Sequence, residues 1–296
     1  MGYAYMLIVL AAWTCLAFVY RRAEKTDANR QVMAVFMGLA VFVLNLAVLA
    51  VRGESVLAAH WSQFALGALN GLCAVAGLPI FMAAVRRGDL SVTWTILTLS
   101  FAPTSIAVIL YPGEEPTAAG VIGLCLAAAA IVLLGFDMMS RRGGIIADGA
   151  RKGWGTFMSL AFLTNTFSLY LYTIGEHCAP DDTQVHRSAF LASFGFALAL
   201  GSLIVSLAAR CPGSKAAGTR LGLAGGLFMF AGSFFTLLAL SAGRVPGYVL
   251  YPATNGGSSV LVVLLSVLLL KERPGIYGWC GIAVGALSLV LFGAAA

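Results

Sequence analysis

Charged residues are scarce in this sequence. They make up 10% of 296 residues, against 60% hydrophobic residues, and the mean hydropathy is +0.93. Soluble domains usually carry roughly 25% charged residues, so this composition excludes an ordinary soluble protein. The chain contains many apolar runs of about 20 residues, the length that crosses a bilayer. We therefore expect an all-α polytopic membrane protein with no room for a separate soluble domain.

Motifs for catalysis are also missing. HExxH does not occur, acidic residues do not fall inside the apolar runs, and the three histidines fall in or near polar loops. A serine nucleophile needs a base within reach, and an intramembrane catalytic site needs a titratable group at depth. We predict that the protein is not an enzyme, with no catalytic residue and no cofactor.

The six cysteines occur singly, and no CxxC is present. This pattern excludes a disulfide framework. One polar segment, 176–182, combines Glu, His, Cys and Asp and is followed by His186, a mixture that zinc accepts. Its spacing matches no standard signature, so a solvated loop is the favoured interpretation and no metal site is predicted.

The net charge of +6 and the pI near 9.1 do not indicate nucleic-acid binding. Such binding needs a clustered basic surface, and no loop is long enough to carry one. Basic residues retained on the cytoplasmic side explain the charge. The expected partners are the lipid bilayer and a small-molecule substrate, and the oligomeric state is left open.

Short polar loops divide the chain into ten predicted spans. They cover about 3–20, 31–51, 61–85, 90–111, 117–136, 154–174, 187–209, 219–242, 247–270 and 275–293. The basic, glycine-containing segment 137–153 is the longest loop. It is predicted to be a cytoplasmic linker between a first half, 1–136, and a second half, 154–296.

A short pattern recurs with an offset of 158 residues. Glu114, Pro116, Gly120 and Gly123 return as Glu272, Pro274, Gly278 and Gly281. Two copies of one unit are therefore predicted. With five spans each, an odd number, the second copy must lie upside down in the membrane. The predicted fold is ten transmembrane helices arranged as two inverted five-helix repeats.

Lys and Arg are distributed unevenly among the loops. Loops that follow odd-numbered spans carry 15 of the 18 basic residues. The positive-inside rule then places both termini on the outer, periplasmic face. The first span has no preceding basic region, which favours a retained span over a cleaved signal peptide. We expect a bacterial cytoplasmic (inner) membrane protein.

Two spans at corresponding positions, 90–111 and 247–270, are interrupted by Gly or Pro and carry polar residues at mid-depth. Loosened backbone is tolerated in a membrane where it lines a cavity, so such a pair indicates a transporter's binding site. Polar groups on other spans add to it. The predicted substrate-binding residues are Trp13, Asn70, Trp94, Thr98, Asn165, Tyr251, Asn255 and Ser258.

The alternative for a single Ser or Thr is a hydrogen bond that holds two helices together, and we favour it for those residues taken one at a time. For Asn255 and Trp94 we favour a role in lining the cavity. A mid-depth Asn must be satisfied, and a Trp away from the headgroups lacks its anchoring role. Spans 117–136 and 275–293 present small faces for helix packing, and Glu114 and Glu272 are expected near the positive ends of those helices.

The paired motifs resemble a known family. Gly113-Glu114, Pro116, Gly120 and Gly123, with Lys271-Glu272, Pro274, Gly278 and Gly281, on a ten-span chain, are similar to the drug/metabolite transporter superfamily, EamA-like branch. The resemblance implies inverted five-span repeats, with a substrate held between the halves and with large contributions from the third, fourth, eighth and ninth spans.

Two features depart from that family. Small multidrug-resistance relatives carry a Glu in the first span, where this chain has Trp13-Thr14, and the basic loop here follows the first span rather than the second. The expected function is secondary transport of a small neutral or zwitterionic metabolite, or a drug-like compound, by alternating access. The alternatives are a channel, which would need a continuous polar lining, and a membrane enzyme without a recognisable catalytic motif.

Overall fold

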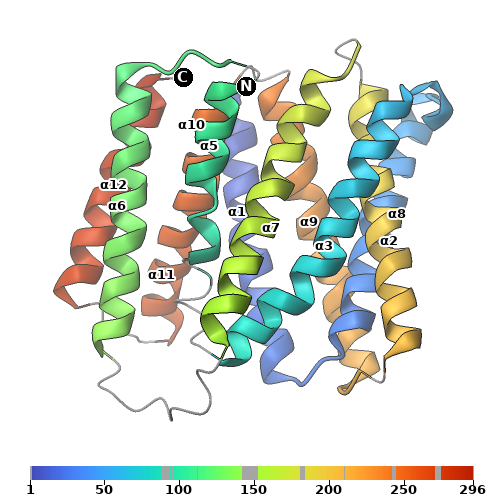
Figure 1. The fold of residues 1–296 in the computed structure, drawn as a ribbon, viewed down its shortest axis with the longest axis horizontal. Coiled ribbons are helices and arrows are strands. Elements are labelled where there is room, and N and C mark those ends of the chain that lie inside the picture. The colour runs from blue at the N-terminus through green and yellow to red at the C-terminus, as the bar shows by residue number, and fades with distance from the viewer. Residues whose placement is uncertain are drawn as a thin grey trace. The chain divides into compact units, whose positions relative to one another are not determined.

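The described part of the chain is helical. The computed structural model describes residues 2–87, 94, 96–111, 113–141, 153–180, 184–209, 211–241, 245–270 and 275–295. Within these ranges there is an isolated bridge between Ala28 and Ser214 but no strand (Figure 1). The prediction of an all-α chain is confirmed. Among the described residues, six helices are long and apolar enough to cross a membrane: Gly2–Ala23, Arg30–Arg52, Trp61–Ala84, Gly155–His177, Gln184–Ala208 and Lys215–Leu240.

Except at the fourth and ninth predicted spans, which are interrupted, the helices follow the predicted spans to within about five residues. They are α1 (Gly2–Lys25), α2 (Arg30–Arg52), α3 (Trp61–Arg87), α5 (Phe101–Leu110), α6 (Ala118–Arg141), α7 (Trp154–His177), α8 (Gln184–Ala208), α9 (Lys215–Leu240), α10 (Gly247–Tyr251), α11 (Gly257–Leu270) and α12 (Ile276–Ala295). A short 3₁₀ turn, η1 (Val56–Ala58), precedes α3, and a π-helical turn, η2 (Pro252–Gly256), separates α10 from α11. Helix α6 extends into the predicted linker, of which residues 142–152 lie outside the described part.

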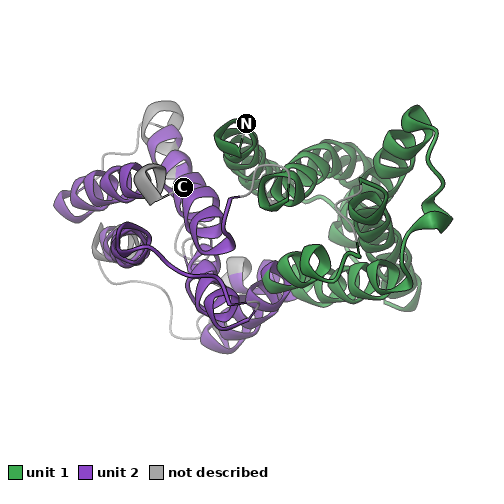
Figure 2. Ribbon diagram, turned by 90° about the horizontal axis from the view of Figure 1, so that it is seen from above, with its two compact units in different colours: residues 1–79, 170–244 green, residues 80–169, 245–296 purple. Residues whose placement is uncertain are grey.

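The chain forms two compact units (Figure 2). Unit 1 comprises residues 1–79 and 170–244, and unit 2 comprises 80–169 and 245–296. Each unit takes helices from both halves of the sequence. Helices α3 and α7 begin in one unit and end in the other.

Unit 1 is built on glycines that let helix backbones touch. Gly67 and Gly71 of α3 lie against carbonyl oxygens of α8, and Gly222 and Gly226 of α9 lie against carbonyl oxygens of α2. A Cβ atom at Gly222 would lie 2.6 Å from the backbone oxygen of Met33. Small residues allow this close approach between membrane helices. Any larger side chain would push the helices apart.

Helices α2 and α8 cross at a second glycine contact in unit 1. A Cβ atom at Gly38 would lie 2.5 Å from the backbone nitrogen of Ala199, and one at Gly195 would lie 2.6 Å from that of Phe42. Each helix therefore contributes one glycine to the crossing.

Hydrogen bonds link the N-terminal ends of α2 and α9. Asn29 caps α2, since its side chain accepts a hydrogen bond from the Val32 N–H at 3.1 Å. Its Nδ2 atom donates to the Cys211 carbonyl at 2.8 Å. Ser214 caps α9 in the same way and also pairs with the backbone on either side of Ala28.

In unit 2, α6 and α12 pack through small residues. The Ser288 hydroxyl donates to the Gly123 carbonyl at 2.8 Å, and a Cβ atom at Gly285 would lie 2.8 Å from Val260 Cγ2. Asp137, at the end of α6, accepts a hydrogen bond from the Gly275 N–H at 3.2 Å, just before α12 begins. The packing role predicted for these two spans is confirmed.

Candidate functional site

The fourth predicted span is interrupted at Leu99 and Ser100. Residues 96–98 are helical, and α5 begins at Phe101. The cause is Pro103, which has no N–H to offer the carbonyl of Leu99 four residues earlier. That carbonyl instead accepts from the Ala102 N–H at 2.9 Å, which tightens the turn.

The ninth predicted span is interrupted by η2, which starts at Pro252. Side chains provide donors to the carbonyls around this widened turn. Thr254 Oγ1 donates to the Leu250 carbonyl at 2.7 Å, and Asn255 Nδ2 donates to the Tyr251 carbonyl at 3.2 Å. The predicted interruption of both spans is confirmed, and single π-helical turns of this kind often occur at functional sites.

The two interruptions meet within unit 2. Ser259 Oγ donates to Thr98 Oγ1 at 2.8 Å, and both side chains are buried. Next to this bond, a Cβ atom at Gly256 would lie 3.9 Å from the ring of Phe101. The broken parts of two spans, about 160 residues apart in sequence, thus face one another. We take this region as the candidate site.

Asn165 of α7 holds the turn of the fourth span. Its Nδ2 atom donates to Ser100 Oγ at 2.6 Å and lies 3.5 Å from the Leu97 carbonyl. One turn further, Thr104 Oγ1 donates to the Ser100 carbonyl at 2.8 Å and to the Thr166 carbonyl at 3.2 Å. Ser100 is therefore central to the site. It is not among the predicted site residues, although the 158-residue offset pairs it with Ser258.

Three other predicted residues of this region are buried. Trp94 packs with its ring edge towards Phe81, with ring centroids 5.8 Å apart. Tyr251 and Ser258 are each 1% exposed, and Ser258 Oγ donates to the Asn255 carbonyl at 2.9 Å. Asn165 and Asn255 are only partly buried. The two asparagines are therefore the most accessible polar groups among the six predicted residues in unit 2.

The remaining two predicted residues, Trp13 and Asn70, lie in unit 1. The indole of Trp13 covers Gly232, where a Cβ atom would lie 2.9 Å from Cε2. Asn70 is fully buried and its side chain interacts with the hydroxyl of Tyr172, which is also 2.9 Å from Ser233 Oγ. Asn70, Tyr172 and Ser233 form a buried polar cluster of their own, which does not include Trp13.

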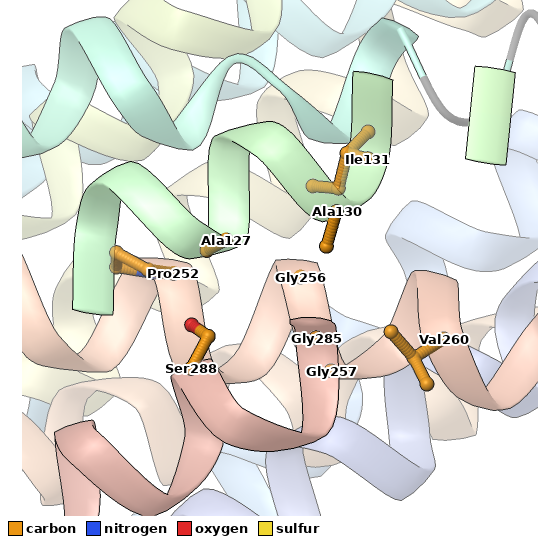
Figure 3. Close-up of a pocket in the computed structure, with 9 residues that line it drawn as sticks. All are labelled: Ala127, Ala130, Ile131, Pro252, Gly256, Gly257, Val260, Gly285 and Ser288. Atoms are coloured by element: carbon orange, nitrogen blue, oxygen red, sulfur yellow. The ribbon is translucent and has the colours of Figure 1, made fainter. Parts of the chain in front are cut away.

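A narrow, largely apolar cavity lies beside η2 (Figure 3). Residues of α6 face residues of η2, α11 and α12 across it. The lining residues are Ala127, Ala130, Ile131, Pro252, Gly256, Gly257, Val260, Gly285 and Ser288. Because glycines and alanines form much of its wall, the cavity leaves free space next to the π-helical turn.

Glu114 fixes the start of the interrupted ninth span. Its carboxylate accepts the N–H groups of Gly247 at 2.9 Å and Tyr248 at 3.1 Å. Burial raises the pKa of Glu114, while these two backbone hydrogen bonds act to lower it. In return, the Tyr248 hydroxyl accepts the Thr117 N–H at 3.2 Å. Glu114 thus caps α10 rather than its own following helix, and Glu272 lies outside the described residues.

The polar segment at 176–186 makes internal contacts. Glu176 accepts from Arg187 at 2.9 and 3.1 Å, and His186 Nδ1 accepts the His60 N–H at 3.2 Å. Among the described residues, no three His, Cys, Asp or Glu side chains are grouped to hold a metal ion. Residues 181–183, with two of the aspartates, lie outside the described part.

The fold and the site define the class as an all-helical membrane protein with two interrupted spans joined at their breaks. No family model matches the chain, and no curated protein matches it. Among solved structures, 28 chains match. One of them, described only as "Crystal structure of protein", has a TM-score of 0.72 and 16% sequence identity, over 98% of this chain and 95% of that one. This likeness shows a shared fold.

Proposed function

We propose that the protein is a secondary transporter that moves a small organic solute by alternating access. The observation that carries this proposal is the bond between Ser259 and Thr98, which joins two broken spans at their interruptions. In secondary transporters, discontinuous helices at corresponding positions of two repeats form the substrate site. Trp94, Asn165 and Asn255 would contact the solute there.

The contacts of α2 and α8 support an arrangement of two inverted repeats. Gly38 touches Ala199, and Gly195 touches Phe42. Position 38 corresponds to 195, and 42 to 199, with one offset of 157 residues. If two equivalent helices cross on a two-fold axis, each contact must occur twice with the partners exchanged. This crossing has that property.

The two broken spans show the same exchange. Thr98 pairs with Ser259, and Phe101 lies against Gly256. Position 98 corresponds to 256, and 101 to 259, with an offset of 158 residues, the offset of the Glu-Pro-Gly-Gly motif. The repeat read from sequence and the exchanged contacts therefore favour the same pseudo-symmetry, which an EamA-like drug/metabolite transporter would have.

Loop contacts support the proposed topology of ten crossings. Four of the hydrogen bonds described above join two loops at helix ends. In each case the distribution of Lys and Arg assigns both loops to the same face of the membrane. The joined residues are Asn29 with Cys211, His60 with His186, Glu114 with Gly247 and Asp137 with Gly275. With the basic loops in the cytoplasm, both termini lie on the periplasmic face of a bacterial inner membrane.

The chemistry of the site favours an uncharged or zwitterionic solute. The two breaks carry no acidic or basic residue, and a lone charge in such a place would have no counter-ion. Binding would use amide and hydroxyl groups together with the Trp94 ring. Exchange of the site between the two faces would follow from movement at the interruptions, where the helices already depart from regular geometry.

Uptake into proteoliposomes tests the proposal. Purified protein should accelerate entry or counterflow of at least one solute from a panel of amino acids, sugars, nucleosides and amphipathic amides. Asn255→Ala and Trp94→Ala should abolish most of that activity. Thr164→Ala is the control, because Thr164 makes the same type of bond to a carbonyl four residues earlier but on an outer surface. Wild-type liposomes no faster than empty ones would refute the proposal.

A further inference from the structure

The side-chain amides of Asn165 and Asn255 have a fixed orientation. The Nδ2 atom of Asn165 lies 3.5 Å from the Leu97 carbonyl, and that of Asn255 lies 3.2 Å from the Tyr251 carbonyl. A carbonyl oxygen only accepts hydrogen bonds, so the nitrogen of each amide must face it. Asn165 Nδ2 also donates to Ser100 Oγ at 2.6 Å; because a hydroxyl can donate or accept, the orientation is set by the two carbonyls. Both Oδ1 atoms consequently point away from these partners.

These two oxygens are open to a ligand. Within the described part of the chain, the bonds of Asn165 and Asn255 run through Nδ2, and neither Oδ1 atom accepts a hydrogen bond. Both side chains are partly exposed, whereas Thr98 and Ser258 beside them are buried. Each asparagine therefore presents an accessible acceptor.

The donors around the breaks are directed into the protein. Ser259 Oγ donates to Thr98, Ser258 Oγ to the Asn255 carbonyl and Thr254 Oγ1 to the Leu250 carbonyl. These hydroxyl hydrogens are used within the chain. These three hydroxyl groups are therefore not available to donate to a ligand.

Both acceptors belong to one region. Asn165 is bonded to the turn at residues 97–100. Asn255 lies one helical turn before Ser259, whose hydroxyl reaches Thr98 in that same turn. The two amide oxygens thus flank the joined breaks from α7 and from the ninth span.

We infer that the transported solute donates hydrogen bonds to these two oxygens from the N–H groups of a primary amine or a primary amide. Two acceptors call for a group with at least two hydrogens, which NH₂ and NH₃⁺ provide and a single hydroxyl does not. A solute that only accepts hydrogen bonds would leave the amide oxygens unpaired in a desolvated site, which strongly disfavours it. The inference rests on the proposed transport function and specifies its substrate class.

The test divides the transport panel into matched solutes. Glycine and nicotinamide carry N–H groups, whereas glycine betaine and methyl nicotinate keep the same net charge but replace the N–H group with a quaternary ammonium or an ester. For a transported pair we expect the N–H compound to be favoured at least about tenfold by wild-type protein, as for loss of one ligand hydrogen bond in a buried site. Asn255→Leu should reduce that preference to within about twofold.

Thr254→Val is the matched control for folding. Like Asn255→Leu, it removes one side-chain bond to a carbonyl of α10, but it leaves the Asn255 oxygen in place. It should keep the preference for N–H compounds, and unfolding temperatures should confirm that both variants are folded. Transport of glycine betaine or methyl nicotinate at the rate of its N–H partner, or an unchanged preference in Asn255→Leu, would overturn the inference but leave transport intact. If no solute is carried, the proposed function falls, and this inference falls with it.

Discussion

Removing Glu176 is expected to destabilise unit 1 more than removing Arg187. The two side chains form an ion pair in which Arg187 Nη2 lies 2.9 Å from Glu176 Oε1, and Nε lies 3.1 Å from both carboxylate oxygens. The Arg187 side chain is 6% exposed and that of Glu176 is 17% exposed. Neither group can regain its full hydration if the other is lost.

The expected magnitudes follow from what each substitution leaves behind. Glu176→Leu takes the carboxylate away from a guanidinium that is 6% exposed, and breaking a buried ion pair from that side costs about 3–5 kcal/mol. Arg187→Met leaves the carboxylate, which at 17% exposed is closer to water, so about 1–3 kcal/mol is expected. With both replaced by apolar residues, the loss should be about 1 kcal/mol or less.

A double-mutant cycle, measured by denaturant unfolding in micelles, gives the coupling free energy between Glu176 and Arg187. We expect it to be about 3 kcal/mol or more. Arg52 and Glu54 supply the control, because their ion pair is 3.4 Å long and the side chains are 55% and 31% exposed. An exposed pair is worth about 0–1 kcal/mol. Equal coupling in the two cycles would refute this reasoning.

Three further outcomes are expected. Gly67→Ala should destabilise the protein by about 1–3 kcal/mol, because its Cβ would overlap a backbone carbonyl. Gly155→Ala should not destabilise it, because a Cβ there meets nothing within 4 Å. Thermal unfolding distinguishes the two variants. Burial raises the pKa of Glu114, so folding favours its protonated form. Wild-type protein should therefore lose stability relative to Glu114→Gln as pH rises from about 4.3 through the raised pKa. Unfolding temperatures of both proteins at each pH test this, and a gain in relative stability with rising pH would contradict it. Gly256→Ala should be tolerated, since its Cβ would enter the cavity with no contact closer than 3.9 Å, but Gly285→Ala should lower the unfolding temperature because its Cβ would lie 2.8 Å from a valine methyl.

Local physics made the helices and their interruptions predictable. Apolar runs of bilayer length correspond to the observed helices. Pro103 and Pro252 lack a backbone N–H donor whatever the tertiary structure, so their effect on the two spans can be predicted from the sequence alone. The prominence of Asn255 follows similarly, since a mid-depth amide must find a partner, and it finds the Tyr251 carbonyl one turn away.

Contacts between distant segments could not be read in that way. Ser100 became important only because α7 brings Asn165 to it, 65 residues along the chain. Glu114 was expected beside its own helix, but it caps α10, which starts 133 residues later. Such partners depend on helix crossings, which hydropathy and motif spacing do not determine. The separation of Trp13 and Asn70 into unit 1 has the same cause.

The glycine contacts of unit 1 have a mechanical consequence. At Gly67, Gly71, Gly222 and Gly226 the neighbouring helix presents backbone and Cβ atoms. These atoms do not move when a side chain changes rotamer, so a rotamer change cannot let one helix slide past its neighbour. The helix pairs α3 with α8 and α9 with α2 should therefore move as stiff bodies. If the protein transports a solute as proposed, bending would concentrate where carbonyls already accept hydrogen bonds from side chains, in the turn that begins at Pro252.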